Sequence, residues 1–138
     1  MSRQVLFGCV ALIIGCAQSP VREGTLPSGD TYRDFSRQPY GYQRVIYGPD
    51  GRERERRELH TEENFKRIKP GMTRAEVVEI VGIPFDTRQY AIGTTSATYR
   101  YHDGVYKLLH VIFGPDGRVL RYETEWDPKV YSRDGPRL

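Results

Sequence analysis

The side chains that could carry catalysis or bind a metal are few and widely spaced in this sequence. None of the three histidines, His60, His102 and His110, is spaced from another histidine or from an acid in the manner of metal ligands. Ser96 lies in the stretch TTSA, which lacks the Gly-x-Ser-x-Gly context of a hydrolase nucleophile. We therefore predict no catalytic residue, no metal site, no cofactor and no small-molecule substrate, and we expect that the protein is not an enzyme.

Cys16 has the most specific predicted chemistry. It follows the apolar run Val5–Gly15, which at eleven residues is too short to span a bilayer. A basic residue, an apolar run and small residues in this order are typical of a secretory signal. The segment Ile13–Cys16 resembles the lipobox of bacterial lipoproteins. This resemblance implies that residues 1–15 are removed as a signal peptide and that Cys16 receives diacylglycerol and an acyl chain such as palmitate.

Lipidation of Cys16 would hold the protein at a membrane, because several acyl chains together anchor a protein firmly. It would also leave no free thiol, since Cys9 is removed with the signal. The resemblance implies sorting to the outer membrane, because Ala17 replaces the aspartate that usually retains enteric lipoproteins in the inner membrane. We expect a periplasmic face. An ordinary secretory signal with a chance cysteine is the alternative.

Length and composition limit the remaining possibilities. A chain of 138 residues with 38% hydrophobic residues has room for one modest core. The net charge of +3 comes from 21 basic and 18 acidic residues, which is too small and too mixed to indicate nucleic-acid binding. Ten tyrosines favour a strand-rich fold, because their amphipathic rings suit half-buried sheet faces.

The stretch GPDGR occurs twice, beginning at Gly48 and at Gly114. A phosphate-binding loop would require GxxxxGK followed by Ser or Thr and a helix, which neither copy has. Pro, Asp and Gly in this order are typical of a tight turn, so both copies predict hairpins. Residues 43–60 are therefore predicted to be a charged hairpin or extension. Their alternating Arg and Glu residues leave an edge strand and a frayed helix both open.

The other segments are predicted from their periodicity. Residues 16–42 show no sustained period, which predicts a flexible tether with a reach of ~28 Å. We expect its aromatic residues to pack back onto the domain; docking on a partner is the alternative. Strands are expected at 97–102, 108–113 and 119–126, with 86–92 as a lead-in strand. Trp126 is expected to complete the core, and residues 128–138 to form a frayed tail.

Residues 61–84 predict two short helices. Thr61 can cap the first helix, which carries Phe65 and Ile68 inward. Thr73 and Glu76 form a capping box for the second helix, and Val77, Ile80 and Val81 form its apolar stripe. Gly82 ends this helix and Pro84 prevents it from resuming. A helix of this length is marginal alone in water, so we expect it to lie against the apolar face of the sheet.

The carboxyl half resembles the SmpA/OmlA (BamE-like) family of outer-membrane lipoproteins. The residues that carry the resemblance are Ile68, Gly71, Met72, Thr73, Glu76, Val77, Gly82 and Pro84, followed by Tyr99–Tyr101, Val111–Phe113 and Asp116–Gly117. The resemblance implies an α+β domain at 61–127, in which two short helices pack on one face of a three-stranded antiparallel sheet. It also implies a non-enzymatic accessory protein that assists β-barrel protein assembly or envelope integrity.

Two features differ from the family pattern. Tyr99 and Tyr101 stand where the family has a Trp-x-Tyr pair, and the charged hairpin before Thr61 has no counterpart. We expect Tyr99 and Tyr101 as contacts to a partner, with subunits of the β-barrel assembly machinery as candidate partners. The alternative function is a periplasmic inhibitor or binding module that acts on an envelope hydrolase, similar to β-lactamase inhibitory protein.

Overall fold

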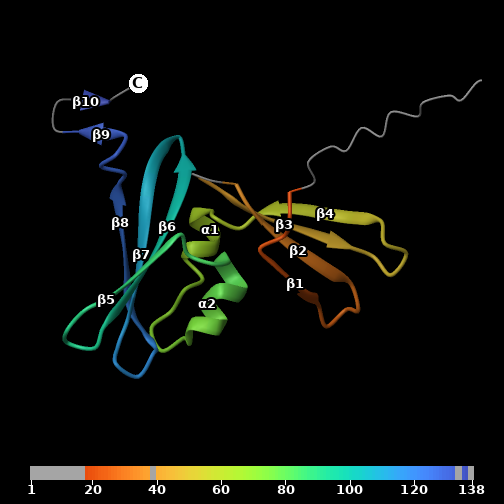
Figure 1. Cartoon of the computed structure of the whole chain (residues 1–138), viewed down its shortest axis with the longest axis horizontal. Coiled ribbons are helices and arrows are strands. Elements are labelled where there is room, and N and C mark those ends of the chain that lie inside the picture. The colour runs from red at the N-terminus through yellow and green to blue at the C-terminus, as the bar shows by residue number, and fades with distance from the viewer. Residues whose placement is uncertain (1–17, 38–39, 133–134, 137–138) are drawn as a thin grey trace, which may run out of the picture.

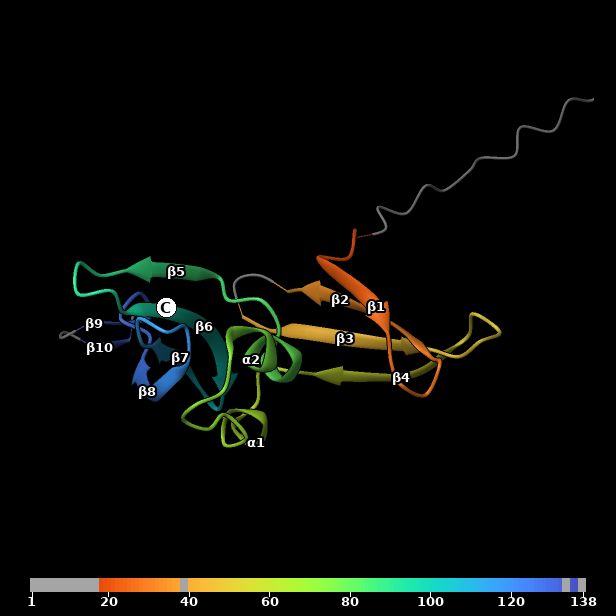
Figure 2. The same cartoon turned by 90° about the horizontal axis from the view of Figure 1, so that it is seen from below.

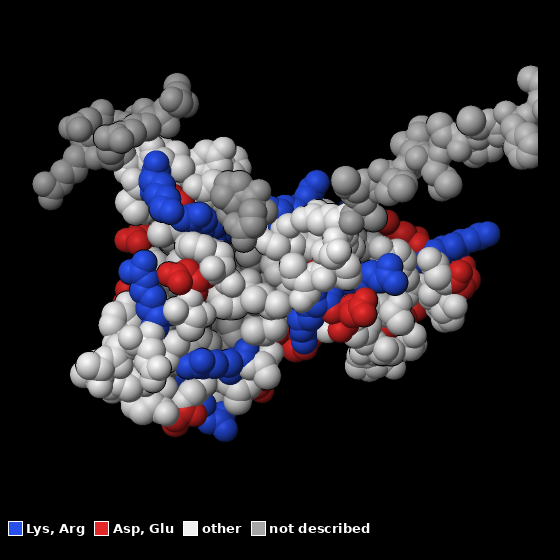
Figure 3. All heavy atoms as spheres, in the orientation of Figure 1, with Lys and Arg blue, Asp and Glu red and all other residues white. Residues whose placement is uncertain are grey.

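The protein contains two antiparallel sheets of four strands each, with two short helices between them (Figures 1 and 2). The computed structural model describes residues 18–37, 40–132 and 135–136. Within these ranges, no helix is both long enough and apolar enough to cross a bilayer. Basic and acidic side chains are interspersed over the face of the molecule in Figure 3, as the small net charge suggests.

The first sheet has the strand order β1-β2-β3-β4, and each neighbouring pair is antiparallel. The strands are β1 (Arg22–Thr25), β2 (Thr31–Ser36), β3 (Tyr42–Tyr47) and β4 (Glu53–Glu58). The first GPDG turn joins β3 to β4, where Gly51 takes a φ of +75° and donates its N–H to the Gly48 carbonyl. The predicted charged hairpin is therefore present, with β4 as an edge strand.

The second sheet has the order β5-β6-β7-β8 and is also antiparallel throughout. The strands are β5 (Asp86–Gln89), β6 (Thr95–Asp103), β7 (Val105–Phe113) and β8 (Val119–Trp126). The second GPDG turn joins β7 to β8, as predicted. A separate two-stranded ribbon follows, made of β9 (Tyr131–Ser132) and β10 (Gly135–Pro136). The tail predicted to be frayed therefore includes this ribbon.

The predicted fold of two helices on a three-stranded sheet is wrong. The expected tether supplies β1, β2 and the first residue of β3, so the charged hairpin becomes half of a four-stranded sheet. The lead-in segment supplies β5, which adds a fourth strand to the second sheet. The inner face of the tether strands is not apolar throughout, because Asp34 on β2 is buried there and pairs with Arg44 on β3.

Both helices begin at the predicted caps. In α1 (Glu62–Phe65), the Thr61 side chain accepts a hydrogen bond from the Asn64 N–H. In α2 (Arg74–Val81), Thr73 and Glu76 form the reciprocal capping box. Gly82 follows with a φ of +79°, a conformation that favours glycine, and ends the helix.

The main core lies between the helices and the inner face of the second sheet. Burying these apolar side chains is the principal source of stability in a small domain. The buried members of this core are Phe65, Ile68, Val77, Val81, Ala97, Tyr99, Tyr101, Leu109, Val111, Phe113 and Val119. The predicted inward positions of both helices are therefore confirmed.

The first sheet packs on the other side of α2. The guanidinium of Arg44 donates to both carboxylate oxygens of Asp34 at 2.7 and 2.9 Å, and both side chains are buried. Arg22, on β1, pairs with Glu79 of α2. The Tyr42 ring lies against Gly82 so closely that a Cβ on Gly82 would come within 2.2 Å of it. The aromatic residues Tyr32 and Tyr42 therefore pack onto the domain.

The last part of the second sheet is not covered by the helices. Tyr122 and Thr124 lie opposite Val111 and Leu109, on the helix side, as the alternation predicts. However, Leu120, Tyr122 and Trp126 are exposed, and Trp126 retains 62% of its accessible surface. The prediction that Trp126 completes the core is wrong, because the two short helices cover only the start of β8 and do not extend to its end.

Candidate interaction groove

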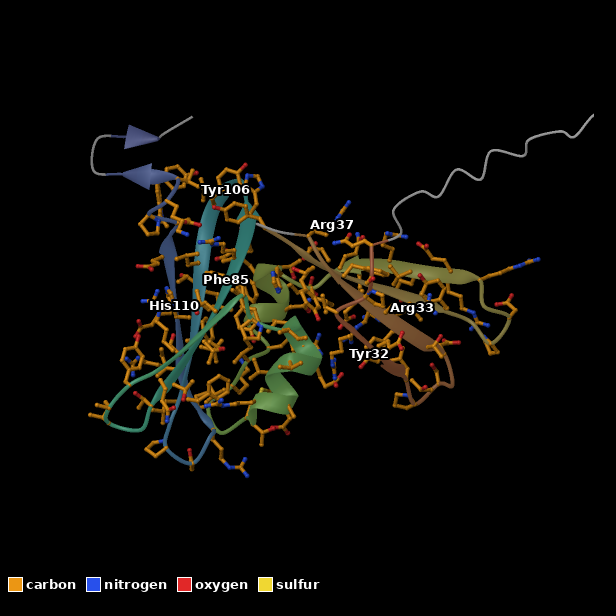
Figure 4. The ribbon with its side chains drawn as sticks, viewed as in Figure 1. Tyr32, Arg33, Arg37, Phe85, Tyr106 and His110 are labelled. Carbon is orange, nitrogen blue, oxygen red and sulfur yellow. The ribbon has the colours of Figure 1, made fainter. Side chains whose placement is uncertain are left out.

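A groove of about 410 Å³ lies on the outer face of the second sheet. The inward residues of β6 are in the core, so Ser96, Thr98 and Arg100 alternate to this outer face. Phe85 and Tyr90 from the β5 region stand on one side, and residues 127–129 on the other. Figure 4 labels Phe85 and His110 on this sheet. The groove thus combines residues from four separate parts of the chain.

Arg100 is held rigidly in the groove. Its guanidinium carbon lies 4.1 Å from the centre of the Phe85 ring, and its Nε lies 3.5 Å from Asp127 Oδ2. Among the described residues, this buried Nε has no hydrogen-bond partner. A cation above an aromatic ring is attracted by the ring quadrupole, and the attraction strengthens when water is excluded. The side chain is therefore positioned before any partner arrives.

Asp127 is fully buried and is fixed by two donors. The Tyr40 hydroxyl donates to Oδ2 at 2.7 Å, and the Lys129 N–H donates to Oδ1 at 2.8 Å. Burial, followed by this hydrogen bond to Asp127, raises the pKa of Tyr40 to about 12. Tyr40 therefore remains a neutral donor, and it connects the loop between β2 and β3 to the groove.

Thr98, His110 and Glu125 form a chain of hydrogen bonds across three strands. Thr98 Oγ1 lies 3.0 Å from His110 Nδ1, and His110 Nε2 lies 2.8 Å from Glu125 Oε1. A hydroxyl, an imidazole and a carboxylate in this order are the groups of an activated nucleophile. Here the Glu125 side chain is 56% exposed, so it orients the imidazole less firmly than a buried acid would.

The contact between His110 and Glu125 is formed by the fold. No histidine has an acid at a metal-ligand spacing in the sequence, yet the register of β7 and β8 brings His110 beside Glu125, fifteen residues later. The sequence signal for this contact is the second GPDG turn, because a hairpin that pairs outward from the turn places residues of β8 opposite residues of β7. Among the described residues, no group of three His, Cys, Asp or Glu side chains could hold a metal ion.

The charges of the groove are mixed. Arg88 pairs with Asp86 at 3.0 Å, and His110 and Arg100 each have an acidic neighbour. Lys129 adds a further cation at the rim. Alternating charges with aromatic side walls suit a polypeptide surface, which presents both charge signs and apolar groups, better than they suit a single small anion.

The predicted partner contacts are not on the surface. Tyr99 and Tyr101 each retain 1% of their accessible surface and face the helices. Tyr101 makes an edge contact with Phe65, with ring centres 4.6 Å apart. Burial raises the pKa of Tyr99 well above its usual range. The two tyrosines are core residues in this structure, and the intervening residue, Arg100, faces the groove instead.

The predicted structural motif is a connected unit around the second GPDG turn. The Gly71 N–H donates to the Val119 carbonyl, and the Val119 N–H donates to the Met72 carbonyl, each at 2.8 Å. The Arg118 side chain donates to the Gly71 carbonyl at 2.8 Å. These bonds hold the start of α2 against the start of β8. Val77 is in the core, and Pro84 lines a small cavity beside α2.

Several residues of the groove were not singled out from the sequence. Phe85 and Asp127 have ordinary local contexts, and only the fold brings them to Arg100. Tyr40 is one of the aromatic residues of the expected tether, and it packs onto the domain by donating to Asp127. Cys16, the predicted lipid attachment site, lies outside the described residues.

Comparison with solved structures shows a distant similarity to a lipoprotein. No protein-family model and no curated protein matches the sequence. Among solved structures, a chain described as the osmotically inducible lipoprotein OsmE is similar with 24% sequence identity and a TM-score of 0.43. The similarity covers 49% of this chain and 80% of that chain. We therefore base the function on the residues and geometry of this chain.

Proposed function

We propose that this protein is a lipid-anchored periplasmic accessory protein of the outer membrane. It assists β-barrel protein assembly or envelope integrity as a structural subunit, by contacting other envelope proteins. Its partners are the membrane, through lipidated Cys16, and protein subunits such as those of the β-barrel assembly machinery. It binds no nucleic acid and turns over no substrate.

The observation that carries this proposal is the preorganised groove on the second sheet. Arginine and aromatic side chains dominate the binding energy of protein interfaces, particularly where they are held in place before binding. Arg100 stacks on Phe85 and lies against the buried Asp127, which Tyr40 fixes from another part of the chain. Such a site recognises a protein surface without reorganising first.

The amino-terminal sequence supports the membrane location. Segment Ile13–Cys16 has the residue types of a lipobox, and the apolar run before it has the length of a signal. A lipid anchor restricts the protein to encounters near one membrane surface, which suits an accessory subunit.

The proposal that the protein is not an enzyme requires a structural role for the hydrogen-bonded series of Thr98, His110 and Glu125. Threonine is a hindered nucleophile, and the exposed Glu125 competes with water for the imidazole. We therefore propose that these three side chains stabilise the outer face of the second sheet by linking β6, β7 and β8.

A photocrosslinking residue at position 90 tests the protein contact directly. Tyr90 lines the groove and is 49% exposed, so its replacement leaves the core intact. We expect crosslinks in living cells to an identified subunit of the β-barrel assembly machinery. The matched control is position 66, where Lys66 is exposed at the end of α1. Equal capture at both positions, or capture of a soluble hydrolase, would contradict the proposal.

Deletion of the gene tests the role in the envelope. We expect lower levels of outer-membrane β-barrel proteins and higher sensitivity to large antibiotics, with recovery when the wild-type gene is returned. A Tyr90→Ala, Lys129→Glu variant should restore these phenotypes poorly, because it changes both sides of the groove. Unchanged protein levels in the deletion strain would count against an assembly role.

A further inference from the structure

The described part of the chain begins very close to the predicted lipid attachment site. The Gln18 side chain donates from Nε2 to the Ser36 carbonyl at 2.7 Å, beside the end of β2. The Val21 N–H donates to the Asp34 carbonyl at 2.8 Å, and β1 begins at Arg22. Gln18 and β1 therefore belong to the folded body, where a flexible tether extending to residue 42 was expected.

Chain length then limits how far the body can move from its anchor. Two residues in extended conformation span at most about 7 Å, so the Cα of Cys16 lies within about 7 Å of the Cα of Gln18. This step rests on the proposed function, in which Cys16 carries the lipid. The surface around Gln18 must then face the bilayer, because the acyl chains begin next to it.

The surface around Gln18 is a shallow groove of about 280 Å³ on the outer face of the first sheet. Its lining residues are Gln18, Phe35, Arg37, Gln43, Tyr47 and Arg56. This face is opposite the one that packs on α2, because Arg33 and Phe35 alternate with the inward Tyr32 and Asp34.

Two arginines of this face, Arg33 and Arg37, remain available to a phosphate. Arg37 is exposed, and no ion pair involves it among the described residues. Arg33 lies over the Tyr47 ring, with its guanidinium carbon 5.4 Å from the ring centre, and its pair with Glu23 is long and exposed at 3.6 Å. Arg56 on the same face is already engaged, because its Nε and Nη2 donate to Glu53 at 2.9 and 2.8 Å and its Nη1 donates to Gln43 at 3.0 Å. Figure 4 labels Arg33 and Arg37 on the first sheet.

We propose that the outer face of the first sheet lies on the phospholipid headgroups, where Arg33 and Arg37 contact lipid phosphates. Arginine binds phosphate through two parallel hydrogen bonds, which surface water weakens less than it weakens a single bond. Tyrosine rings are favoured at the boundary between headgroups and water, as Tyr47 would be in this orientation. The anchor and this face together fix the orientation of the body, and leave the groove of the second sheet for a protein partner.

A fluorescence quenching experiment tests the orientation. The mature acylated protein has no free thiol, so single cysteines at Tyr47 and, as the control, at exposed Leu120 of the second sheet can be labelled with a fluorophore. The full lipoprotein is placed in vesicles that contain headgroup-labelled quencher lipid. We expect strong quenching at position 47 and weak quenching at position 120. Equal quenching at the two positions would overturn the inference.

A vesicle-binding experiment tests the arginines without the anchor. The mature chain, residues 16–138 with Cys16→Ser, should bind vesicles that contain an anionic phospholipid more tightly than zwitterionic vesicles. The Arg33→Glu, Arg37→Glu variant should bind anionic vesicles at least about tenfold more weakly. The control variant Arg67→Glu, Arg121→Glu reverses the same number of exposed arginines outside the first sheet and should bind normally. Equal weakening in both variants would contradict a specific face.

The two proposals fail separately. Mass spectrometry of the membrane-bound protein shows whether Cys16 is acylated, and an unmodified Cys16 would overturn the lipid anchor of the proposed function. Acylated protein without preferential quenching at position 47 would overturn only the headgroup contact.

Discussion

The imidazole of His60 joins the two sheets. It stacks on Tyr42 of the first sheet at 5.3 Å between ring centres and makes an edge contact with Tyr99 of the second sheet at 5.5 Å. Its Nδ1 lies 3.1 Å from the Arg100 carbonyl oxygen, so the neutral ring donates this hydrogen bond. Burial lowers the pKa of His60 to about 4. The folded state therefore strongly prefers the neutral ring.

This preference predicts a loss of stability in mild acid. The folded pKa of about 4 lies below the usual value of 6.5, so the unfolded state binds the proton first as the pH falls. The contribution of neutral His60 is complete above pH 6.5 and is lost as the pH falls through 4. Urea unfolding at pH 7 and pH 4.5 should show that the wild type loses about 2 kcal/mol more than His60→Gln. Parallel losses in the two proteins would show that His60 does not titrate in this way.

Trp126 is a large apolar residue that contributes little to the core. It is exposed and contacts Tyr131 with ring centres 5.2 Å apart. Trp126→Ala should therefore lower the free energy of unfolding by less than about 1 kcal/mol. Phe113→Ala is the control, because Phe113 is buried and a buried aromatic costs about 3–5 kcal/mol to truncate. Similar effects in thermal unfolding would place Trp126 in a packed environment.

At the scale of the elements, a glycine precedes α2 and another follows it, and the two glycines are required for different reasons. Gly71 and Gly82 both have φ near +80 to +90°, at +89° and +79°. A Cβ on Gly71 meets nothing within 4 Å, whereas a Cβ on Gly82 would strike the Tyr42 ring. Gly71 is required only for its left-handed backbone conformation. Gly82 is required for the same conformation and also leaves room for the Tyr42 ring, so that the first sheet can approach α2.

These two glycines form a matched pair for mutation. Gly71→Ala should destabilise the protein by about 1–2 kcal/mol, the cost of the left-handed conformation for an L-residue. Gly82→Ala should cost clearly more, because the Tyr42 ring must also move. Urea unfolding of both variants measures the difference. Equal values would mean that the contact between β3 and α2 is loose.

At the scale of the whole molecule, a buried ion pair connects the first sheet to the rest. Arg44 donates to Asp34, lies 4.2 Å from the centre of the Tyr32 ring, and approaches the Glu79 carbonyl of α2 at 3.5 Å. Although burial alone would lower it, the pKa of Arg44 is raised by the hydrogen bonds to Asp34. The pair is therefore charged and mutually dependent.

Removing one partner should destabilise both halves of the molecule. Asp34→Ala leaves Arg44 buried without a countercharge, which costs about 3–5 kcal/mol. We expect a single unfolding transition at lower temperature, together with faster amide exchange in both β3 and α2. The Asp34→Ala, Arg44→Met variant should recover part of the loss, because it removes the unpaired charge. A change confined to the first sheet would show that the two sheets unfold independently.

Local sequence signals predicted the parts of this fold that depend on a few neighbouring residues. Both GPDG turns, the caps at Thr61 and Thr73, and the helix end at Gly82 are present as predicted. Each depends on a backbone angle or a hydrogen bond within four or five residues, and such chemistry is encoded by residue type. The alternation of β8 was also correct, although its apolar face is uncovered.

The sequence by itself therefore determined the turns, the helix caps and the alternation of the strands. Only the tertiary structure decided that residues 22–36 form strands, because Asp34 is tolerated inside a sheet once Arg44 pairs with it. It also decided that Tyr99 and Tyr101 are buried, and that Arg100, Phe85, Asp127 and Tyr40 meet in one groove. The physical reason is that contacts between distant segments depend on strand register and on which face each neighbour covers, and no short stretch of sequence contains that information.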